Sequence, residues 1–139
     1  MNLITDIFFD LYGVLIDYQH NKIKINSNTK LLPELDKFYS LWIISNASNQ
    51  QIKNLKQDYN FFNYFKEIIT SESAEYSKPD TRIFQYALKK AKTNPYSSLF
   101  IDDSNTNVQA AKKLGFHEQG TANVEIKIIE EGDGEYMHH

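Results

Sequence analysis

Short apolar runs alternate with amphipathic stretches along most of this chain. The apolar runs occupy residues 3–9, 41–44, 67–70 and 98–101. They are nearly continuous rather than alternating, which is typical of strands buried on both faces of a parallel sheet. The helical period of three to four residues governs residues 31–39, 50–59, 80–92 and 105–114. This order predicts an α/β fold, a three-layer Rossmann-like domain with a mostly parallel sheet of about five strands and helices on both faces.

The segment after the first apolar run departs from this alternation. Residues 16–28 are mostly polar, and apolar and charged residues alternate with a period of two over positions 22–25. We therefore expect a small hairpin or flap there, within a single domain that spans residues 1–131. The polar residues 132–139 are expected to form a disordered tail. Whether its final His138 and His139 are native or belong to a purification tag is left open.

Composition narrows the classes of function. The 139 residues include no cysteine, which excludes disulfides, thiolate metal sites and a cysteine nucleophile. The net charge of -3 argues against a nucleic-acid partner, because such a partner calls for a basic face. No apolar run approaches the ~18 residues of a membrane span, and no secretion signal is recognisable. We therefore expect a cytoplasmic protein that does not contact a membrane.

Polar residues directly follow three of the apolar runs. Asp10 follows the first run, Ser45 the second, and the pair Asp102 and Asp103 the fourth. Ligands of open parallel sheets bind beyond the carboxyl ends of the strands, so we expect these side chains to share one crevice. Each residue alone could be an ordinary helix cap or turn residue. Three such positions in succession are harder to explain in that way.

Four short motifs contain or flank these positions. They read FFDLYGVL over residues 8–15, IISN over 43–46, KPDTRIF over 78–84, and FIDDS over 100–104 with Asn107 in the next stretch. Their order and their places at strand ends and helix starts resemble the haloacid dehalogenase-like hydrolase superfamily, from residue 7 to about residue 120. The resemblance implies hydrolysis through an aspartate nucleophile, most commonly of a phosphorylated small molecule or a larger phosphorylated substrate.

The resemblance also implies roles for individual residues. Asp10 would attack the substrate and form an aspartyl-phosphate, which water then hydrolyses. Ser45 and Lys78 would complete the catalytic set, because the phosphoryl group spreads negative charge over three oxygens that need partners. Asn46 and Tyr12 would join them in binding the substrate. Taken alone, Lys78 would be read as a solvated surface lysine, and Asn46 as a helix-capping residue.

A magnesium ion is implied as cofactor, because two negative groups must approach each other at such a site. The resemblance assigns its ligands to the carboxylates of Asp10 and Asp103 and to the backbone carbonyl of Tyr12. Asp102 would be an additional ligand or would act indirectly. A double helix cap is the alternative for Asp102 and Asp103.

Tyr12 is a departure from the pattern of the phosphatases that this chain resembles. They carry a second aspartate two positions after the nucleophile, as the acid that protonates the leaving group. Such an acid contributes about 10²–10⁴-fold in rate, and a phenol with a pKa of about 10 is a poor substitute. We therefore expect a weak or specialised phosphatase. It would act on leaving groups such as acyl groups, which need no proton, or use an acid from the flap, Asp17 or His20.

Two other functions remain open. Haloacid dehalogenases are similar to this chain in carrying tyrosine at the position of Tyr12, but they use no magnesium and lack the acidic pair. The other alternative is a non-catalytic domain that binds phosphate or a partner. The intervals from Asp10 to Ser45 and from Ser45 to Lys78 are too short for a cap domain. An open crevice results, which a large substrate or a second subunit of a homodimer could cover.

Overall fold

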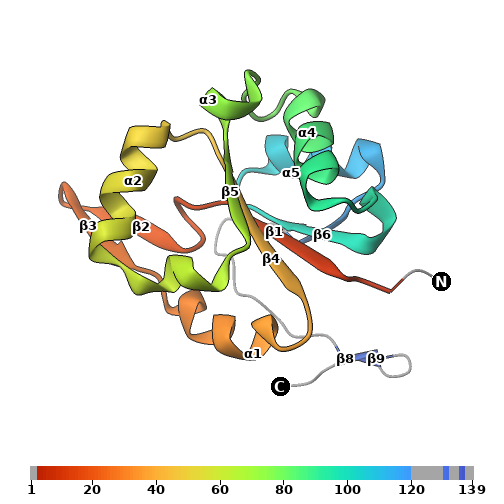
Figure 1. Cartoon of the computed structure of the whole chain (residues 1–139), viewed down its shortest axis with the longest axis horizontal. Helices are drawn as coiled ribbons and strands as arrows, with labels where there is room; N and C mark the ends of the chain where they lie inside the picture. Colours follow the sequence, from red (N-terminus) through yellow and green to blue (C-terminus); the bar gives the residue numbers. More distant parts are fainter. Residues whose placement is uncertain (1–2, 120–129, 132–134, 137–139) are drawn as a thin grey trace.

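A five-stranded parallel sheet forms the centre of the computed structural model, which describes residues 3–119, 130–131 and 135–136. The strand order is β5-β4-β1-β6-β7, and every pair is parallel. The strands are β1 (Asp6–Phe9), β4 (Ser40–Ser45), β5 (Glu67–Thr70), β6 (Ser98–Ile101) and β7 (His117–Gln119). Most of the predicted tail lies outside the described residues. The predicted α/β fold is confirmed, and β1 lies at the middle of the sheet (Figure 1).

Helices cover both faces of this sheet. One face packs on the helices η1 (Ser27–Leu31), α1 (Leu32–Asp36), α2 (Asn49–Asp58) and η2 (Asn60–Tyr64). The other packs on α3 (Ser71–Ala74), α4 (Thr81–Ala91) and α5 (Asn105–Leu114), with η3 (Pro95–Ser97) before β6. Successive strand residues point to opposite faces, so Phe9 joins the first layer and Phe8 the second. The sheet therefore lies between two layers of buried side chains.

Trp42 ties β4 to β1 within the second layer. Its ring stacks on Phe8 with centroids 6.1 Å apart, and its Nε1 donates a hydrogen bond of 2.8 Å to Oδ2 of Asp6. This hydrogen bond satisfies the polar atom of an indole that is only 8% exposed. The sequence contains no other tryptophan.

The helix predicted over residues 31–39 is shorter in the structure. Of the apolar positions in the pattern, Leu35 is buried in α1, Leu31 belongs to η1, and Phe38 is 59% exposed and lies beyond the helix. The strand β4 begins at Ser40, so the chain must leave the helix before the apolar pattern ends. The short edge strand β7 has no apolar run of its own, which explains why the sequence did not locate it.

A hairpin follows β1, as predicted for the flap. Its strands β2 (Ile16–Gln19) and β3 (Lys22–Ile25) pair antiparallel. The two turn residues, His20 and Asn21, have φ values of 53° and 63°. Positive φ at both turn residues gives the twist that two-residue hairpins require. Two further short strands, β8 (Glu130–Glu131) and β9 (Glu135–Tyr136), pair with each other near the C-terminus.

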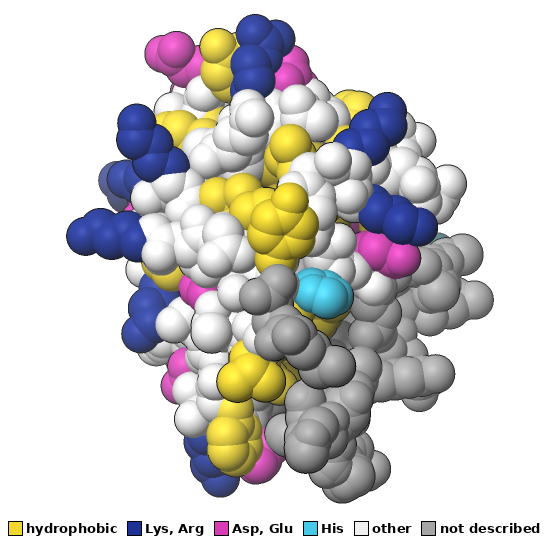
Figure 2. Space-filling view, turned by 90° about the vertical axis from the view of Figure 1, so that its right-hand side faces the viewer, with side chains coloured by type: hydrophobic (Ala, Val, Ile, Leu, Met, Phe, Trp, Pro, Cys, Tyr) yellow, Lys and Arg dark blue, Asp and Glu magenta, His cyan; other side chains and the backbone are white. Residues whose placement is uncertain are grey.

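Large apolar side chains also reach the surface. The most exposed are Leu3, Tyr18, Ile25, Phe38, Tyr76 and Tyr96. Figure 2 shows one face on which apolar side chains lie near the centre while lysine and arginine side chains lie around it. Within the described residues, no helix has the length and apolar character needed to span a membrane.

Candidate active site

The register of the central strands brings the predicted residues to one edge of the sheet. Phe9 of β1 lies opposite Ile43 of β4 and Ile101 of β6. The next residue of β1, Asp10, donates its backbone N–H to the carbonyl of Ile101 at 2.9 Å. Asp102 follows Ile101 directly. The carboxyl ends of β4, β1 and β6 thus form one crevice, as the strand-end argument predicted.

Lys78 lies at the floor of this crevice with its side chain only 2% exposed. Its Nζ lies 2.7 Å from Oδ1 of Asp10, 3.1 Å from Oδ2 of Asp102 and 2.8 Å from the carbonyl oxygen of Ile44. An ammonium has three hydrogens to donate, and these three acceptors account for all of them. Lys78 is therefore a fixed charge between two carboxylates and not a solvated surface lysine.

Asn46 holds the backbone that carries Lys78. Its Oδ1 accepts the N–H of Lys78 at 2.8 Å, and its Nδ2 donates to the carbonyl oxygen of Lys78 at 3.1 Å. The Lys78–Pro79 peptide is cis, and Asp80 then caps α4 by accepting the N–H of Arg82. The side-chain amide of Asn46 thus positions Lys78. The substrate contact expected from the sequence stays a prediction.

Asp102 is fully buried and has several hydrogen-bond donors around it. Its Oδ1 accepts the N–H of Ser104 at 2.9 Å, and its Oδ2 accepts from Nδ2 of Asn107 at 3.0 Å as well as from Lys78. Ser104 is also the N-cap of α5, so the capping geometry fixes this carboxylate. Of the two alternatives for Asp102, these contacts favour the indirect role.

Three carboxylates converge near the ammonium of Lys78. Asp10, Asp102 and Asp103, which we call the acidic cluster, each offer a ligand oxygen, and these oxygens lie within 4.8 Å of one another. Carboxylate oxygens are the ligands that magnesium prefers, so the donor chemistry of the cluster fits this ion. Asp10 has a side chain that is 14% exposed, so one of its oxygens remains accessible beside the buried contact to Lys78.

Gly13 allows the two loops of the acidic cluster to approach each other. Its φ is +88°, in the left-handed region that favours glycine, and an added Cβ would lie 2.7 Å from Cγ of Asp103. The backbone between Leu11 and Ile16 is tightly coiled, since the N–H groups of Leu15 and Ile16 both bond to the carbonyl of Leu11. The loop after β1 therefore packs directly on the carboxylate of Asp103.

The electrostatic environment disfavours negative charge at the cluster unless a cation is present. Burial raises the pKa of Asp10 to about 6, while the neighbouring Lys78 charge opposes this rise. Burial, and next the charge of Asp102, also raise the pKa of Asp103. A divalent cation would favour the ionised forms of both carboxylates.

Ser45 ends β4 beside these groups. It is 1% exposed, and its Oγ accepts the backbone N–H of Ala47 at 3.1 Å. That contact uses a lone pair of the oxygen and leaves the hydroxyl proton as a donor. The residue can therefore donate a hydrogen bond to a phosphoryl oxygen in the crevice.

A cavity of about 660 Å³ adjoins the acidic cluster. Its lining consists of Tyr12, Gly13, Asp17, Tyr18, Gln19, Gln51 and Asp103. The rings of Tyr12 and Tyr18, which we call the tyrosine stack, lie with centroids 5.8 Å apart at an interplanar angle of 15°. Burial, and next the neighbouring Tyr18, raise the pKa of Tyr12, so its phenol stays protonated at neutral pH.

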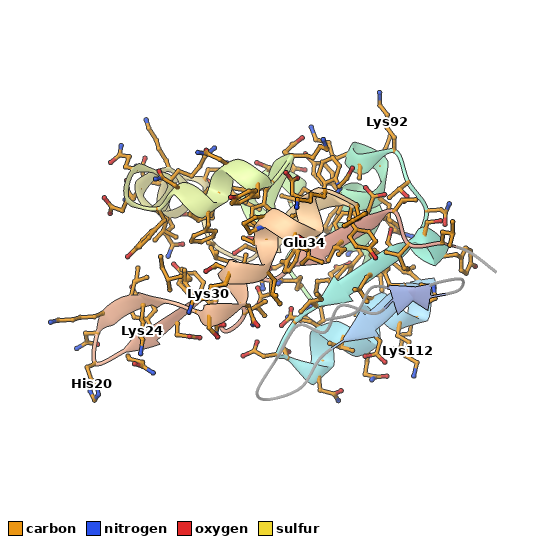
Figure 3. The ribbon with its side chains drawn as sticks, turned by 90° about the horizontal axis from the view of Figure 1, so that it is seen from below. His20, Lys24, Lys30, Glu34, Lys92 and Lys112 are labelled. Atoms are coloured by element: carbon orange, nitrogen blue, oxygen red, sulfur yellow. The ribbon has the colours of Figure 1, made fainter. Side chains whose placement is uncertain are left out.

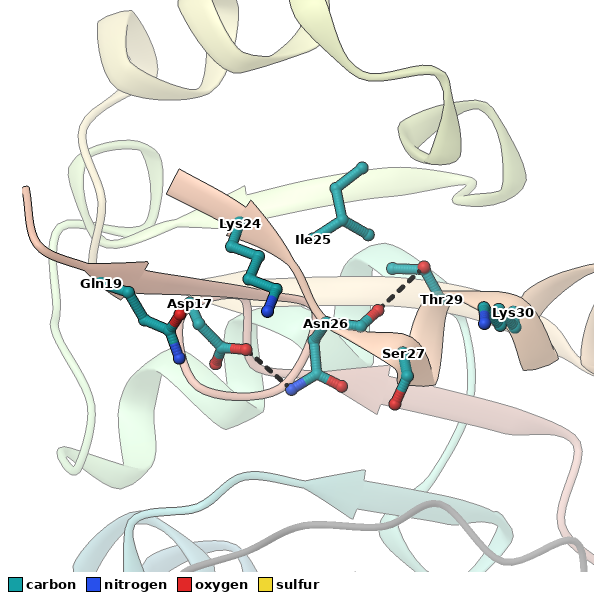
Figure 4. A pocket seen from close by; sticks show the side chains of 8 residues that line it. All are labelled: Asp17, Gln19, Lys24, Ile25, Asn26, Ser27, Thr29 and Lys30. Carbon is teal, nitrogen blue, oxygen red and sulfur yellow. Dashed lines mark hydrogen bonds between the residues drawn. The ribbon is translucent and has the colours of Figure 1, made fainter. Parts of the chain in front are cut away.

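Of the two flap residues considered as replacement acids, only Asp17 lines the cavity beside the acidic cluster. His20 is exposed at the outer tip of the hairpin (Figure 3). Asp17 accepts a hydrogen bond of 3.0 Å from Nδ2 of Asn26, on the side of a second pocket of about 500 Å³ (Figure 4). This second pocket is lined by Asp17, Gln19, Lys24, Ile25, Asn26, Ser27, Thr29 and Lys30.

Sequence reasoning missed Tyr18, Gln19 and Gln51 of the cavity beside the cluster. Tyr18 lies in β2, whose pattern indicated only a hairpin, and nothing in the sequence pairs it with Tyr12. Gln51 belongs to the capping box of α2, where its side chain accepts the N–H of Ser48 at 2.8 Å. The Ser48-to-Gln51 spacing could have identified the start of this helix, though not its place at the crevice.

Comparison with protein families identifies the class of this protein. Residues 17–119 match the family model described as haloacid dehalogenase-like hydrolase. The chain therefore belongs to this family, and the resemblance inferred from the four motifs is confirmed.

Among curated proteins, the phosphoglycolate phosphatase of Pseudomonas putida is 32% identical over 73 residues, which are 52% of this chain and 27% of that protein. The D-ribitol-5-phosphate phosphatase of Bacteroides thetaiotaomicron is 28% identical over 86 residues, 62% of this chain and 39% of that protein. The matched regions thus span less than half the length of either relative.

Solved structures share the fold over most of the chain. A HAD family enzyme of Bacteroides thetaiotaomicron, crystallised with magnesium and inorganic phosphate, has a TM-score of 0.79 at 19% identity, covering 88% of this chain and 96% of that one. A structure described as a dehalogenase has a TM-score of 0.77 at 14% identity, with coverage of 85% and 84%. At these identities the likeness establishes the fold.

Proposed function

We propose that this hydrolase is a magnesium-dependent phosphatase that acts through an aspartyl-phosphate on Asp10. The observation that carries the proposal is the contact set of Lys78, whose ammonium bonds to Asp10 and Asp102 of the acidic cluster. If Lys78 were a solvated surface lysine and the two aspartates only helix caps, no buried ammonium bonded to two carboxylates would be expected. The phosphatases among its relatives support the same class of reaction.

The residues of the chain divide the work as follows. An oxygen of Asp10 attacks phosphorus, the P–O bond to the leaving group breaks, and the leaving oxygen keeps the electron pair. Lys78 holds the other oxygen of Asp10, and Ser45 donates to a phosphoryl oxygen. Magnesium, held by Asp10, Asp103 and the backbone carbonyl of Tyr12, would neutralise phosphoryl charge. Water then cleaves the acyl phosphate and restores Asp10.

The position that holds the leaving-group acid in the phosphatases that this chain resembles carries no carboxylic acid here. Tyr12 stands at the position of that acid, and the rise in its pKa makes the phenol an even weaker proton donor. We therefore propose substrates with a stable leaving group, such as acyl or aryl phosphates. The shortage of proton donors at this point would limit the rate with simple alkyl phosphates.

The direct test is phosphate release from acetyl phosphate and p-nitrophenyl phosphate with magnesium, for the wild-type protein and Asp10→Asn. We expect turnover by the wild type, loss of turnover in Asp10→Asn, and loss on chelation of the metal by EDTA. Equal inertness of both proteins would overturn the proposal and favour a binding domain. Chloride release from 2-chloropropionate without metal would overturn it in favour of a dehalogenase.

A further inference from the structure

The cavity beside the acidic cluster is close enough to the candidate active site to receive the leaving group of a phosphate ester. It shares Tyr12, Gly13 and Asp103 with the candidate active site. In-line displacement places the leaving oxygen on the side of phosphorus opposite to Asp10. A substrate whose phosphoryl group meets Asp10 and Asp103 can therefore extend its leaving group into this cavity.

No basic side chain is among the described residues that line this cavity. Its described lining contains two carboxylates, two tyrosines, two glutamines and a glycine, with no lysine, arginine or histidine. The ammonium of Lys78 is already bonded to three oxygens and is 2% exposed. Lys24 faces Asp17 across the hairpin, but it lines the second pocket (Figure 4). A carboxylate on the leaving group would therefore meet the carboxylate of Asp17 in this lining and no basic side chain to pair with.

The tyrosine stack offers a flat apolar surface in the same cavity. The ring of Tyr12 stacks on one face of the Tyr18 ring. Tyr18 is 63% exposed despite this contact. Such an exposed aromatic face, held rigid by its neighbour, is suited to stacking against a planar group. At the other wall, the Oε1 of Gln51 accepts the N–H of Ser48, which leaves its amide nitrogen free to donate.

We propose that the substrate of this hydrolase is a phosphorylated compound with an uncharged leaving group that carries a flat face, with Tyr18 and Gln51 as the residues that select it. The inference rests on the proposed phosphatase function and refines it. Tyr18 contacts the face of the leaving group, and the carboxylate of Asp17, with no basic side chain beside it in the lining, disfavours acidic leaving groups.

Two pairs of substrates, each matched in size but not in charge, test the rejection of acids. They are 4-carbamoylphenyl phosphate with 4-carboxyphenyl phosphate, and glycerol 3-phosphate with 3-phosphoglycerate. We expect kcat/KM to be about tenfold or more higher for the uncharged member of each pair, because the acidic member places its carboxylate near that of Asp17 with no basic side chain in the lining. Equal values, or a preference for the acids, would overturn the inference while leaving the phosphatase function intact. No release of phosphate from any of these compounds or from acetyl phosphate would instead defeat the phosphatase function.

The role of Tyr18 is tested with Tyr18→Ala and, as a matched control, Phe38→Ala. Both positions are exposed aromatic residues, but Phe38 lies beyond α1 and away from the cavity lining. In Tyr18→Ala, the ratio of kcat/KM for phenyl phosphate to that for acetyl phosphate should fall about fivefold to tenfold, mainly through KM. Phe38→Ala should keep the wild-type ratio. An unchanged ratio in Tyr18→Ala, with circular dichroism like that of the wild type, would contradict the stacking role.

Discussion

Gly13 lies against the carboxylate of Asp103, so close that a side chain on Gly13 would overlap it. The two residues come from loops that follow different strands of the sheet, β1 and β6. The main chain after the nucleophile thus forms one wall for an acid that the proposed magnesium ion requires. This contact makes the orientation of Asp103 depend on the absence of a side chain at position 13.

The first prediction concerns Gly13→Ala. The added Cβ must displace Asp103, and alanine at a φ of +88° is strained, so magnesium affinity should fall at least tenfold and stability by about 1–3 kcal/mol. Isothermal titration calorimetry and urea unfolding measure the two effects. Gly115→Ala is the control, because its φ is +106° and its Cβ would meet the Tyr96 ring, far from any predicted ligand. It should lose stability and keep its magnesium affinity. Equal affinities in both variants would contradict the proposed role of Asp103.

The second prediction concerns the buried cation. Lys78→Met leaves Asp10 and Asp102 without their shared partner, so we expect a destabilisation of about 3–5 kcal/mol and loss of turnover. Added magnesium should restore part of the stability, because it supplies positive charge to the same carboxylates. The comparison is Lys90→Met, which removes an exposed ion pair with Glu67 and should cost less than about 1 kcal/mol. Urea unfolding followed by circular dichroism, with and without magnesium, measures both. A Lys78→Met protein as stable as Lys90→Met would show that the buried charges are not coupled.

The third prediction concerns proton supply to the leaving group. Tyr12→Asp places a carboxyl group where related phosphatases have their acid, so turnover of glycerol 3-phosphate should rise by about tenfold or more. Acetyl phosphate needs no such proton, and its turnover should change far less. Steady-state kinetics on the two substrates decides the matter. A similar change for both substrates would mean that Tyr12 does not limit proton transfer.

The fourth prediction concerns pH and the cap of α4. Hydrogen bonds from Arg82 lower the pKa of the Asp80 carboxyl from 3.8 to about 2. A lowered folded-state pKa gives stability that is complete above about pH 4 and is lost as the pH falls toward about 2. NMR titration should show this low pKa in the wild type and a rise toward 3.8 in Arg82→Leu. An unchanged pKa in that variant would assign the shift to the backbone cap alone.

Strand-end positions were predictable because parallel strands must deliver their following residues to the same edge. Asp10, Ser45 and Asp102 therefore came together as the sequence indicated. The unequal environments of Asp102 and Asp103 were not predictable, since they depend on how the start of α5 turns one carboxylate inward onto Ser104 and Asn107. The motif match implied that Lys78 lies near Asp10. Its further bond to the carbonyl of Ile44 depends on tertiary packing that no local pattern encodes.

The tyrosine stack shows a similar limit. Tyr12 was visible in the sequence as a departure from a motif, but its contact with Tyr18 depends on how the hairpin folds back after β1. Such a contact is set by the twist and length of β2 and β3, which an alternating pattern of residues does not determine. The shortened α1 has the same origin, because β4 had to begin at Ser40 to keep its register with β1.

The single tryptophan gives this molecule an internal optical probe. Trp42 is packed on Phe8 and bonded to Asp6 in the middle of the sheet, below the crevice rather than in it. Its fluorescence emission should therefore change when the β1–β4 contact loosens and should not change when a side chain at the rim of the crevice is replaced. Emission spectra can thus distinguish substitutions that disrupt the fold from those that abolish only catalytic activity.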